Sequence, residues 1–250
     1  MLFLDTSAQG ERIFGEKRRE LDALVRRQSA RTSTYVWEEF RCTFLRDAVL
    51  FHQLLVDANW SVPDALRRSE RYQPQQPRRQ KRVRQVYYNL LDDGELEDIR
   101  DRLELLIEGV LESRFWAGVA AADTARETGC VHGGSPPRRE GDTYRFGPSC
   151  RADKPPPCAI EHFWRSHADE LAAVAEGAEH LPDDLQEAPR TAAAIRSGAA
   201  KPHGNNCHKH LSDCVIATEA SPDDGILTTN VRHFRPICEL IGRTLYDSGS

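Results

Sequence analysis

The fold is indicated most clearly by one stretch near the C-terminus, SDCVIATEASPDDGILTTNVRHF, residues 212–234. Ser212 and Asp213 are favourable at the positive end of a helix, and they open a predicted helix over 212–220. SPDDG then predicts a turn and ILTT a strand, which ends just before Asn230. The stretch therefore predicts a helix followed by a short strand with a polar residue at its carboxyl end.

The N-terminus contains a similar strand end. LFLD at residues 2–5 predicts a short buried strand that ends in an acid, Asp5. Strands that alternate with helices indicate the α/β class, with a central, mainly parallel sheet flanked by helices. Ligands of such sheets bind at the carboxyl ends of the strands, where Asp5 and Asn230 are expected. Apolar residues at helical spacing predict further helices over 11–28, 34–55, 95–122, 160–180 and 188–197, with a break at 30–33.

The composition is that of a soluble globular protein. The chain has 250 residues, of which 39% are hydrophobic and 29% charged. It has no apolar run near the ~18 residues that a membrane span needs, and its start, MLFLDTSAQGER, lacks the pattern of a signal peptide. We therefore expect a cytoplasmic protein with no membrane partner, in which the seven cysteines are not a disulfide framework.

Positive charge is concentrated in one region, although the net charge is −5. A cluster of this kind indicates a surface that holds the phosphates of a nucleic acid. The alternative is that its cations pair with the acids of residues 92–112 on two solvated helix faces. Only one acid, Glu70, accompanies the eight cations of this region: Arg67, Arg68, Arg71, Arg78, Arg79, Lys81, Arg82 and Arg84.

The basic region has two further features. Pro74 and Pro77 argue against a continuous helix, so residues 67–85 are predicted to be an exposed connection. Tyrosines flank it and are candidates for stacking on unpaired bases, although such residues are more often part of a core or its rim. These are Tyr72, Tyr87 and Tyr88.

Three acids in distant segments are candidate metal ligands: Asp5, Glu39 and Asp213. Hydrolysis of a phosphodiester without a covalent intermediate requires an activated water and a stabilised leaving oxygen, and one or two Mg²⁺ or Mn²⁺ ions supply both. These hard cations prefer oxygen ligands in a small carboxylate cluster with open positions for water and phosphate. Acids that converge at strand ends meet that need.

Four segments resemble, in order and in local spacing, the signature segments of PIN domains: LFLDTS, YVWEEF, SDCVIATEA and ILTTNVRHF. This family consists largely of metal-dependent ribonucleases, including the toxins of bacterial toxin–antitoxin pairs. The resemblance implies a PIN-like α/β fold and a catalytic site in which Asp5, Glu39 and Asp213 bind the metal. It places Asn230 at the fourth position of the site.

The chain departs from the family pattern at Asn230, where many members have an aspartate. An amide oxygen still coordinates a cation, but the cluster loses one negative charge, which favours a single tightly bound metal. Asp223 or Asp224, in the preceding turn, is a candidate to compensate. Neighbouring helix positions point about 100° apart, so only one of Glu38 and Glu39 faces the cluster. Glu39 is preferred because it lies nearer the apolar face of its helix.

Other polar side chains are expected around these ligands. The resemblance implies that Thr6, Ser7 and Thr228 support the carboxylates. His210 lies three residues before Asp213, so it is a candidate to contact phosphate or to tune a ligand. The alternative for His210 is a solvated histidine at a helix entrance.

The resemblance covers residues 1–60 and 207–247 of what we expect to be a single domain spanning 1–250. It leaves 65–200 as a large helical and loop insertion, in which residues 129–158 are rich in Gly, Pro and Cys. A structural Zn²⁺ would order such a segment, but no C-x-x-C pair is present, and unpaired thiols on loops are the alternative. The candidate zinc ligands are Cys130, Cys150, Cys158 and Cys207.

The sequence thus predicts a metal-dependent endoribonuclease that cleaves RNA, or another single-stranded nucleic acid, with Mg²⁺ or Mn²⁺. Two alternatives stay open. One is the toxin of a toxin–antitoxin pair, with the same chemistry and an inhibitory antitoxin as partner. The other is a catalytically weak PIN domain that binds nucleic acid or protein. A different regulatory protein and a second copy of the chain, in a homodimer, are the remaining candidate partners.

Overall fold

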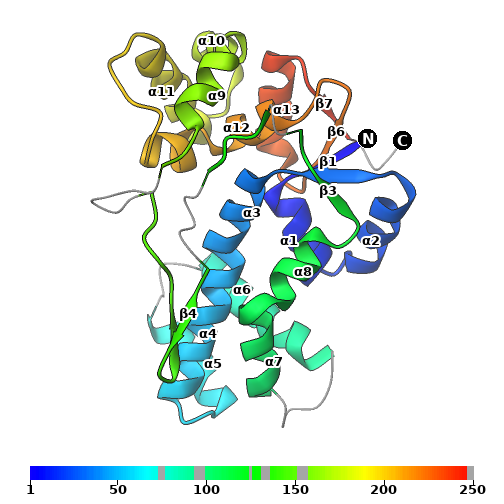
Figure 1. Cartoon of the computed structure of the whole chain (residues 1–250), viewed down its shortest axis with the longest axis vertical. Coiled ribbons are helices and arrows are strands. Elements are labelled where there is room, and N and C mark those ends of the chain that lie inside the picture. Colours follow the sequence, from blue (N-terminus) through cyan, green and yellow to red (C-terminus); the bar gives the residue numbers. More distant parts are fainter. Residues whose placement is uncertain (73–76, 93–98, 124–125, 131–135, 151–156, 247–250) are drawn as a thin grey trace.

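A five-stranded sheet, parallel throughout, organises the molecule (Figure 1). The structure, a computed structural model, describes residues 1–72, 77–92, 99–123, 126–130, 136–150 and 157–246. The strands are β1 (Leu2–Leu4), β2 (Ala30–Thr32), β3 (Val119–Ala121), β6 (Gly225–Leu227) and β7 (Thr244–Leu245), in the spatial order β3-β2-β1-β6-β7. The predicted α/β class with a parallel sheet flanked by helices is therefore confirmed.

The central strand, β1, is apolar along its whole length because both of its faces are covered. Leu2, Phe3 and Leu4 are each at most 1% exposed. β1 pairs with β2 on one side and with β6 on the other, so the order of the strands reverses beside it. In α/β proteins, ligands bind at the carboxyl ends of the two strands beside such a reversal, which here are β1 and β6.

Helices cover the sheet and extend well beyond it, as Figure 1 shows. The described α-helices are α1 (Thr6–Phe14), α2 (Arg18–Arg27), α3 (Thr34–Phe40), α4 (Arg46–Asp57), α5 (Val62–Tyr72), α6 (Pro77–Asp92), α7 (Ile99–Leu105), α8 (Leu111–Trp116), α9 (Ile160–Ser166), α10 (Ala168–Glu176), α11 (Glu187–Arg196), α12 (Ser212–Glu219) and α13 (Val231–Ile241). Short π-helical turns are η1 (Arg41–Leu45), η3 (Leu106–Val110) and η7 (Asn206–His210), and 3₁₀ turns are η5 (Ala178–His180) and η6 (Asp183–Leu185).

The predicted helix over 11–28 is wrong, because it is two helices. Gly15 ends α1 with an extended backbone, and α2 begins three residues later. The predicted break at residues 30–33 is instead β2, whose three residues pair in parallel with β1 and β3. The predicted helix over 34–55 is confirmed, with η1 as a π-helical turn in the middle.

The described parts of the basic stretch, 67–72 and 77–85, are helical, which corrects the predicted exposed connection there, whereas Pro74 lies outside the described residues. They belong to α5 and α6, and Val83 and Val86 of α6 are buried in the core. Pro77 is the first residue of α6, a position where a missing backbone N–H costs nothing. Pro77 thus lies in the interior of no helix, as expected, but it begins a new helix where an exposed connection was predicted.

The predicted helix over 95–122 ends earlier than expected. Within its described part, α7, η3 and α8 continue to residue 116, and Gly118 then turns the chain with φ of 70° into β3. The sheet therefore takes one strand from inside the region 65–200 that was assigned to an insertion. The same region contains a small antiparallel hairpin of β4 (Arg138–Glu140) and β5 (Thr143–Arg145). No helix in the described residues is long and apolar enough to cross a membrane.

Buried aromatic rings and one buried arginine hold the helices in place around the site. Phe40 of α3 is fully buried and packs on Phe44 and Phe115, with ring centroids 4.7 and 5.1 Å apart. Arg12 of α1 is 3% exposed, and its guanidinium donates hydrogen bonds to the carbonyl oxygens of Phe115 (2.6 Å) and Ala117 (2.9 Å). These contacts fix α1 and α3 against the segment that leads into β3.

Candidate active site

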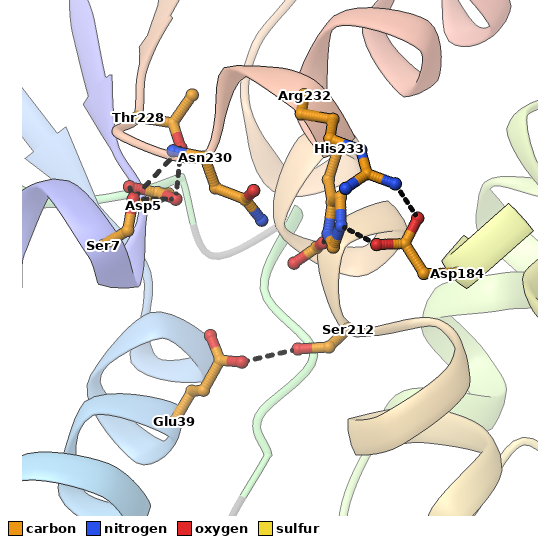
Figure 2. A network of polar contacts seen from close by, with 10 residues as sticks. Asp5, Ser7, Glu39, Asp184, Ser212, Thr228, Asn230, Arg232 and His233 are labelled. Carbon is orange, nitrogen blue, oxygen red and sulfur yellow. Dashed lines mark hydrogen bonds and ion pairs between the residues drawn. The ribbon is translucent and has the colours of Figure 1, made fainter. Parts of the chain in front are cut away.

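Asp5 follows β1 and links the two central strands. It is 2% exposed and caps α1, since its Oδ1 accepts a hydrogen bond from the backbone N–H of Ala8 at 2.7 Å. Its Oδ2 accepts hydrogen bonds from the hydroxyls of Ser7 (2.9 Å) and Thr228 (2.7 Å), so the carboxylate bridges the ends of β1 and β6 (Figure 2). Its backbone N–H donates to the carbonyl of Leu227 at 3.1 Å.

Glu39 reaches the same region from α3. Its Oε1 accepts a hydrogen bond from the hydroxyl of Ser212 at 2.9 Å (Figure 2), and its Oε2 accepts one from the hydroxyl of Thr6. Glu38 points elsewhere and forms an ion pair with Arg41 at 2.7 Å. Glu39 is therefore the glutamate that faces α1 and α12, as preferred from the sequence.

Asp213 lies in the first turn of α12 and is held by a histidine. His233 Nδ1 is 3.0 Å from Asp213 Oδ2. Its Nε2 is 3.0 Å from Asp184 Oδ2, as Figure 2 shows. Arg232 also contacts Asp184, at 3.1 Å. The hydrogen bond to Asp213 raises the pKa of His233, and the one to Asp184 adds to this effect. An imidazole between two carboxylates can donate a hydrogen bond to each of them only in its protonated form, in which both ring nitrogens carry a hydrogen.

Asn230 stands between these groups. It lies at the start of α13, and its backbone N–H donates to the hydroxyl of Thr228 at 2.9 Å. Figure 2 shows its amide between Asp5 and His233, with no hydrogen bond drawn to the side chain. The side chain of Asn230 therefore lies between Asp5 and His233, and its role as a cation ligand stays a prediction.

Burial and repulsion raise the pKa of two carboxylates of this site, Asp5 and Glu39. Burial raises the pKa of Asp5 to about 6, and repulsion from Asp213 adds to this rise. Burial raises the pKa of Glu39 to about 7, with added repulsion from Asp213 and, less strongly, from Asp5. Hydrogen bonds from Thr6 and Ser212 oppose the rise at Glu39. The three acids are therefore close enough to repel one another, and a bound cation would relieve that repulsion.

The donor set suits a hard divalent cation, because it consists of carboxylate and amide oxygens. In the arrangement seen here, however, no three His, Cys, Asp or Glu side chains of the described residues are close enough together to hold a metal ion. Both oxygens of Glu39 are engaged by hydroxyls, and Asp213 is turned toward His233. Coordination by all three acids therefore requires that these side chains move closer together. An oxygen that accepts one hydrogen bond keeps a lone pair for a cation, so the present partners can remain.

Several residues predicted for the site lie elsewhere. His210 contacts the hydroxyl of Thr191 at 3.1 Å, on the side of α11. Asp224 precedes β6, at the opposite edge of the sheet from Asp5, and is buried in an ion pair with Arg31 at 2.6 Å. Asp223, beside it, is exposed at that same edge. Neither acid replaces the charge that is missing at Asn230.

The four candidate zinc ligands are not brought together. All seven cysteines lie in described parts of the chain, and none forms a disulfide. The Cys207 thiol contacts the hydroxyl of Tyr35 at 3.7 Å, whereas Cys158 lies 3.7 Å from His203 Nδ1. Cys150 is near Cys42, whose pKa burial raises to about 11. The predicted set Cys130, Cys150, Cys158 and Cys207 therefore forms no zinc site in this structure.

The cations of the basic region are divided between internal ion pairs and the surface. Arg79 and Arg82 both bind the buried carboxylate of Asp47, at 2.7 and 2.5 Å. Arg67 pairs with Asp64 and Arg84 with Glu70, so the partners are not the acids of 92–112. Lys81 is exposed, and Arg68 lies beside Arg67 in a shallow depression on α5. The side chain of Arg78 falls outside the described residues.

The sequence analysis missed three residues of this site: Ser212, Asp184 and His233. Ser212 directly precedes Asp213, so its hydroxyl could have been expected near the acids. His233 follows Asn230 by three residues, which places it one helical turn away. Asp184 is 49 residues from its partner, and no local pattern indicates it.

Comparison with known proteins does not assign the chain to a family. No family model matches it, and searches of curated proteins and of solved structures find no significant match.

The contact between His233 and Asp213 gives a testable prediction for the nuclease proposed below. His233→Ala removes the group that orients Asp213 and balances its charge, so we expect cleavage to slow about tenfold. Asp184→Ala removes only the outer partner of the imidazole and should slow cleavage less. Initial rates at saturating Mn²⁺ test this order, and an Asp184→Ala variant slower than His233→Ala would contradict it.

Proposed function

We propose that this chain is a metal-dependent nuclease of the PIN type, and that its substrate is RNA. The proposal is carried by one observation: acids from three distant segments lie near the carboxyl ends of β1 and β6, close enough that Asp213 repels Asp5 and Glu39. Asp5 follows β1, Glu39 comes from α3 and Asp213 from α12, and burial and repulsion raise the pKa of the first two. The four segments that resemble PIN domains contribute these residues, together with Asn230.

The proposed roles follow from the chemistry of each group. Asp5, Glu39 and Asp213 hold the cation directly or through water, and Asn230 ligates it or orients a water. Thr6, Ser7, Ser212 and Thr228 keep the carboxylates in place through their hydroxyls. A bound Mg²⁺ or Mn²⁺ supplies an activated water and neutralises charge on the leaving oxygen.

A second candidate is a PIN-like module that binds nucleic acid without cleaving it. One observation favours it: among the described residues, no three potential ligands are grouped closely enough to hold a metal ion. The neutral Asn230 at the fourth position also favours this second candidate, because a neutral side chain attracts a cation less strongly than an aspartate does.

Incubation with single-stranded RNA and single-stranded DNA distinguishes the two candidates. We expect RNA cleavage that requires Mg²⁺ or Mn²⁺, stops in EDTA, and is lost in Asp5→Asn. Asparagine at this position keeps an oxygen for the Ala8 N–H, so the cap on α1 is retained. Binding of RNA without cleavage in either metal, over a range of pH, would leave only the second candidate.

A further inference from the structure

A basic groove lies between α2 and α6, away from the acids of the site. It has a volume of about 1190 Å³ and is lined by five cations but only two acids, Glu16 and Asp22. One of these acids, Asp22, is within 3.4 Å of the buried Arg12. The cations are Arg18, Arg19 and Arg26 of α2, and Lys81 and Arg84 of α6.

The cations face the groove because of their helical spacing. Arg18 and Arg26 are eight residues apart on α2, and Lys81 and Arg84 are three apart on α6, so each pair lies along one face of its helix. Arg84 forms an ion pair with Glu70. Arg18, Arg19, Arg26 and Lys81 have no ion-pair partner within the parts of the chain that the structure describes. The groove thus carries positive charge that the protein itself leaves uncompensated.

An exposed aromatic ring adds a second kind of contact. Tyr88 follows Arg84 by four residues on the same face of α6, lines the groove, and is 61% exposed. It is among the few large apolar side chains of the described residues that stay at the surface. Cations that follow a phosphate backbone and an aromatic ring that stacks on a base are the two features of a surface for single-stranded nucleic acid.

We propose that the α2–α6 groove binds single-stranded RNA outside the cleaved position. The proposal rests on the proposed function only for the choice of RNA as the strand. α1 connects the two places: it begins beside Asp5 and ends at Phe14, which lines the groove. Nine helical residues span about 13 Å, so a strand in the groove lies several nucleotides from the acids. Arg18, Arg19, Arg26 and Lys81 bind phosphates, and Tyr88 stacks on a base.

Binding of a fluorescent 15-nucleotide RNA, measured by anisotropy in EDTA, tests the groove without cleavage. We expect Arg19→Glu/Lys81→Glu to weaken binding at least about tenfold and to reduce its dependence on salt. Tyr88→Ala should weaken binding about fivefold or more, while Tyr88→Phe, which keeps the stacking ring, binds normally. Arg27→Glu is the matched control for Arg19→Glu alone, because each reverses one exposed charge of α2 and only Arg19 lines the groove.

Two outcomes would overturn the groove proposal. One is equal binding by Arg19→Glu and Arg27→Glu. The other outcome combines two results: a poly-glutamate peptide binds through the same cations, and Tyr88→Ala leaves the affinity for RNA unchanged. Together they would assign the groove to an acidic protein. A different result would contradict the proposed function and leave the groove proposal standing: the wild-type protein binds RNA in the groove but does not cleave it with any metal.

Discussion

Asp213→Asn is expected to abolish metal-dependent cleavage while leaving the fold intact. The substitution removes one of three acids and with it most of the attraction for a divalent cation, so we expect a loss on the order of 10³-fold, about 4 kcal/mol in the barrier. The side chain of Asp213 is 23% exposed and does not cap α12, whose N-cap is Leu211. An asparagine side chain therefore fits at this position without disturbing the helix.

The matched control for this variant is Asp223→Asn. It makes the same chemical change in an exposed acid at the opposite edge of the sheet, and cleavage should be unchanged. Circular dichroism and thermal unfolding establish that both variants fold. Retention of full Mn²⁺-dependent cleavage by Asp213→Asn would exclude the proposed mechanism.

Glu219→Gln is expected to remove a large part of the pH dependence of stability. Glu219 ends α12 and is 1% exposed, with Oε1 accepting from the Thr128 backbone N–H at 3.0 Å and Oε2 from the hydroxyl of Ser33. Burial raises its pKa to about 8, because these hydrogen bonds only partly offset the cost of a buried charge. Glutamine keeps the shape and carries no charge at any pH.

The sign follows from the direction of the pKa shift. In the unfolded chain Glu219 ionises near pH 4.5, whereas in the folded protein it stays protonated up to about pH 8. Its contribution to stability is fully present below pH 4.5 and is lost as the pH rises to 8, a change on the order of 4 kcal/mol. The raised pKa values of Asp5 and Glu39 also lower the free energy of unfolding as the pH rises. Glu219→Gln therefore removes only the part of this pH dependence that comes from Glu219.

Urea unfolding at pH 5, 7 and 9 measures this effect. The free energy of unfolding of Glu219→Gln should fall less than that of the wild type between pH 5 and 9. Glu179→Gln, in an 83% exposed side chain, should follow the wild-type curve. Parallel curves for Glu219→Gln and the wild type would show that Glu219 ionises normally in the folded protein.

The sequence predicts the parts of the fold that have strong local patterns. The helix over 212–220 and the strand after it were placed nearly as the structure has them, because each carries a cap or turn signal beside an apolar run. β2 and β3 were missed because ART (30–32) and VAA (119–121) lack the run of large apolar residues that marks β1. Their strand conformation comes from pairing with β1 and with each other.

For the candidate site and its surroundings, too, the sequence predicts the residues that belong to a local motif and misses contacts between distant segments. Asp5, Glu39 and Asp213 were expected in one region, and they lie near enough to repel one another, because motif residues at strand and helix ends carry a signal in the sequence. The pairing of Arg79 and Arg82 with Asp47 has no such signal, since the partners are more than 30 residues apart and meet only through the packing of α6 on α4. Counting charges along the chain therefore could not show which cations face the surface.

The contacts of Asp5 also determine when the site can exist. Thr228, which holds its carboxylate, and Leu227, which accepts its backbone N–H, lie more than 220 residues later in the chain. During synthesis, the N-terminal acid leaves the ribosome long before its partners are made. The nascent chain thus has no assembled site until β6 and α13 have emerged.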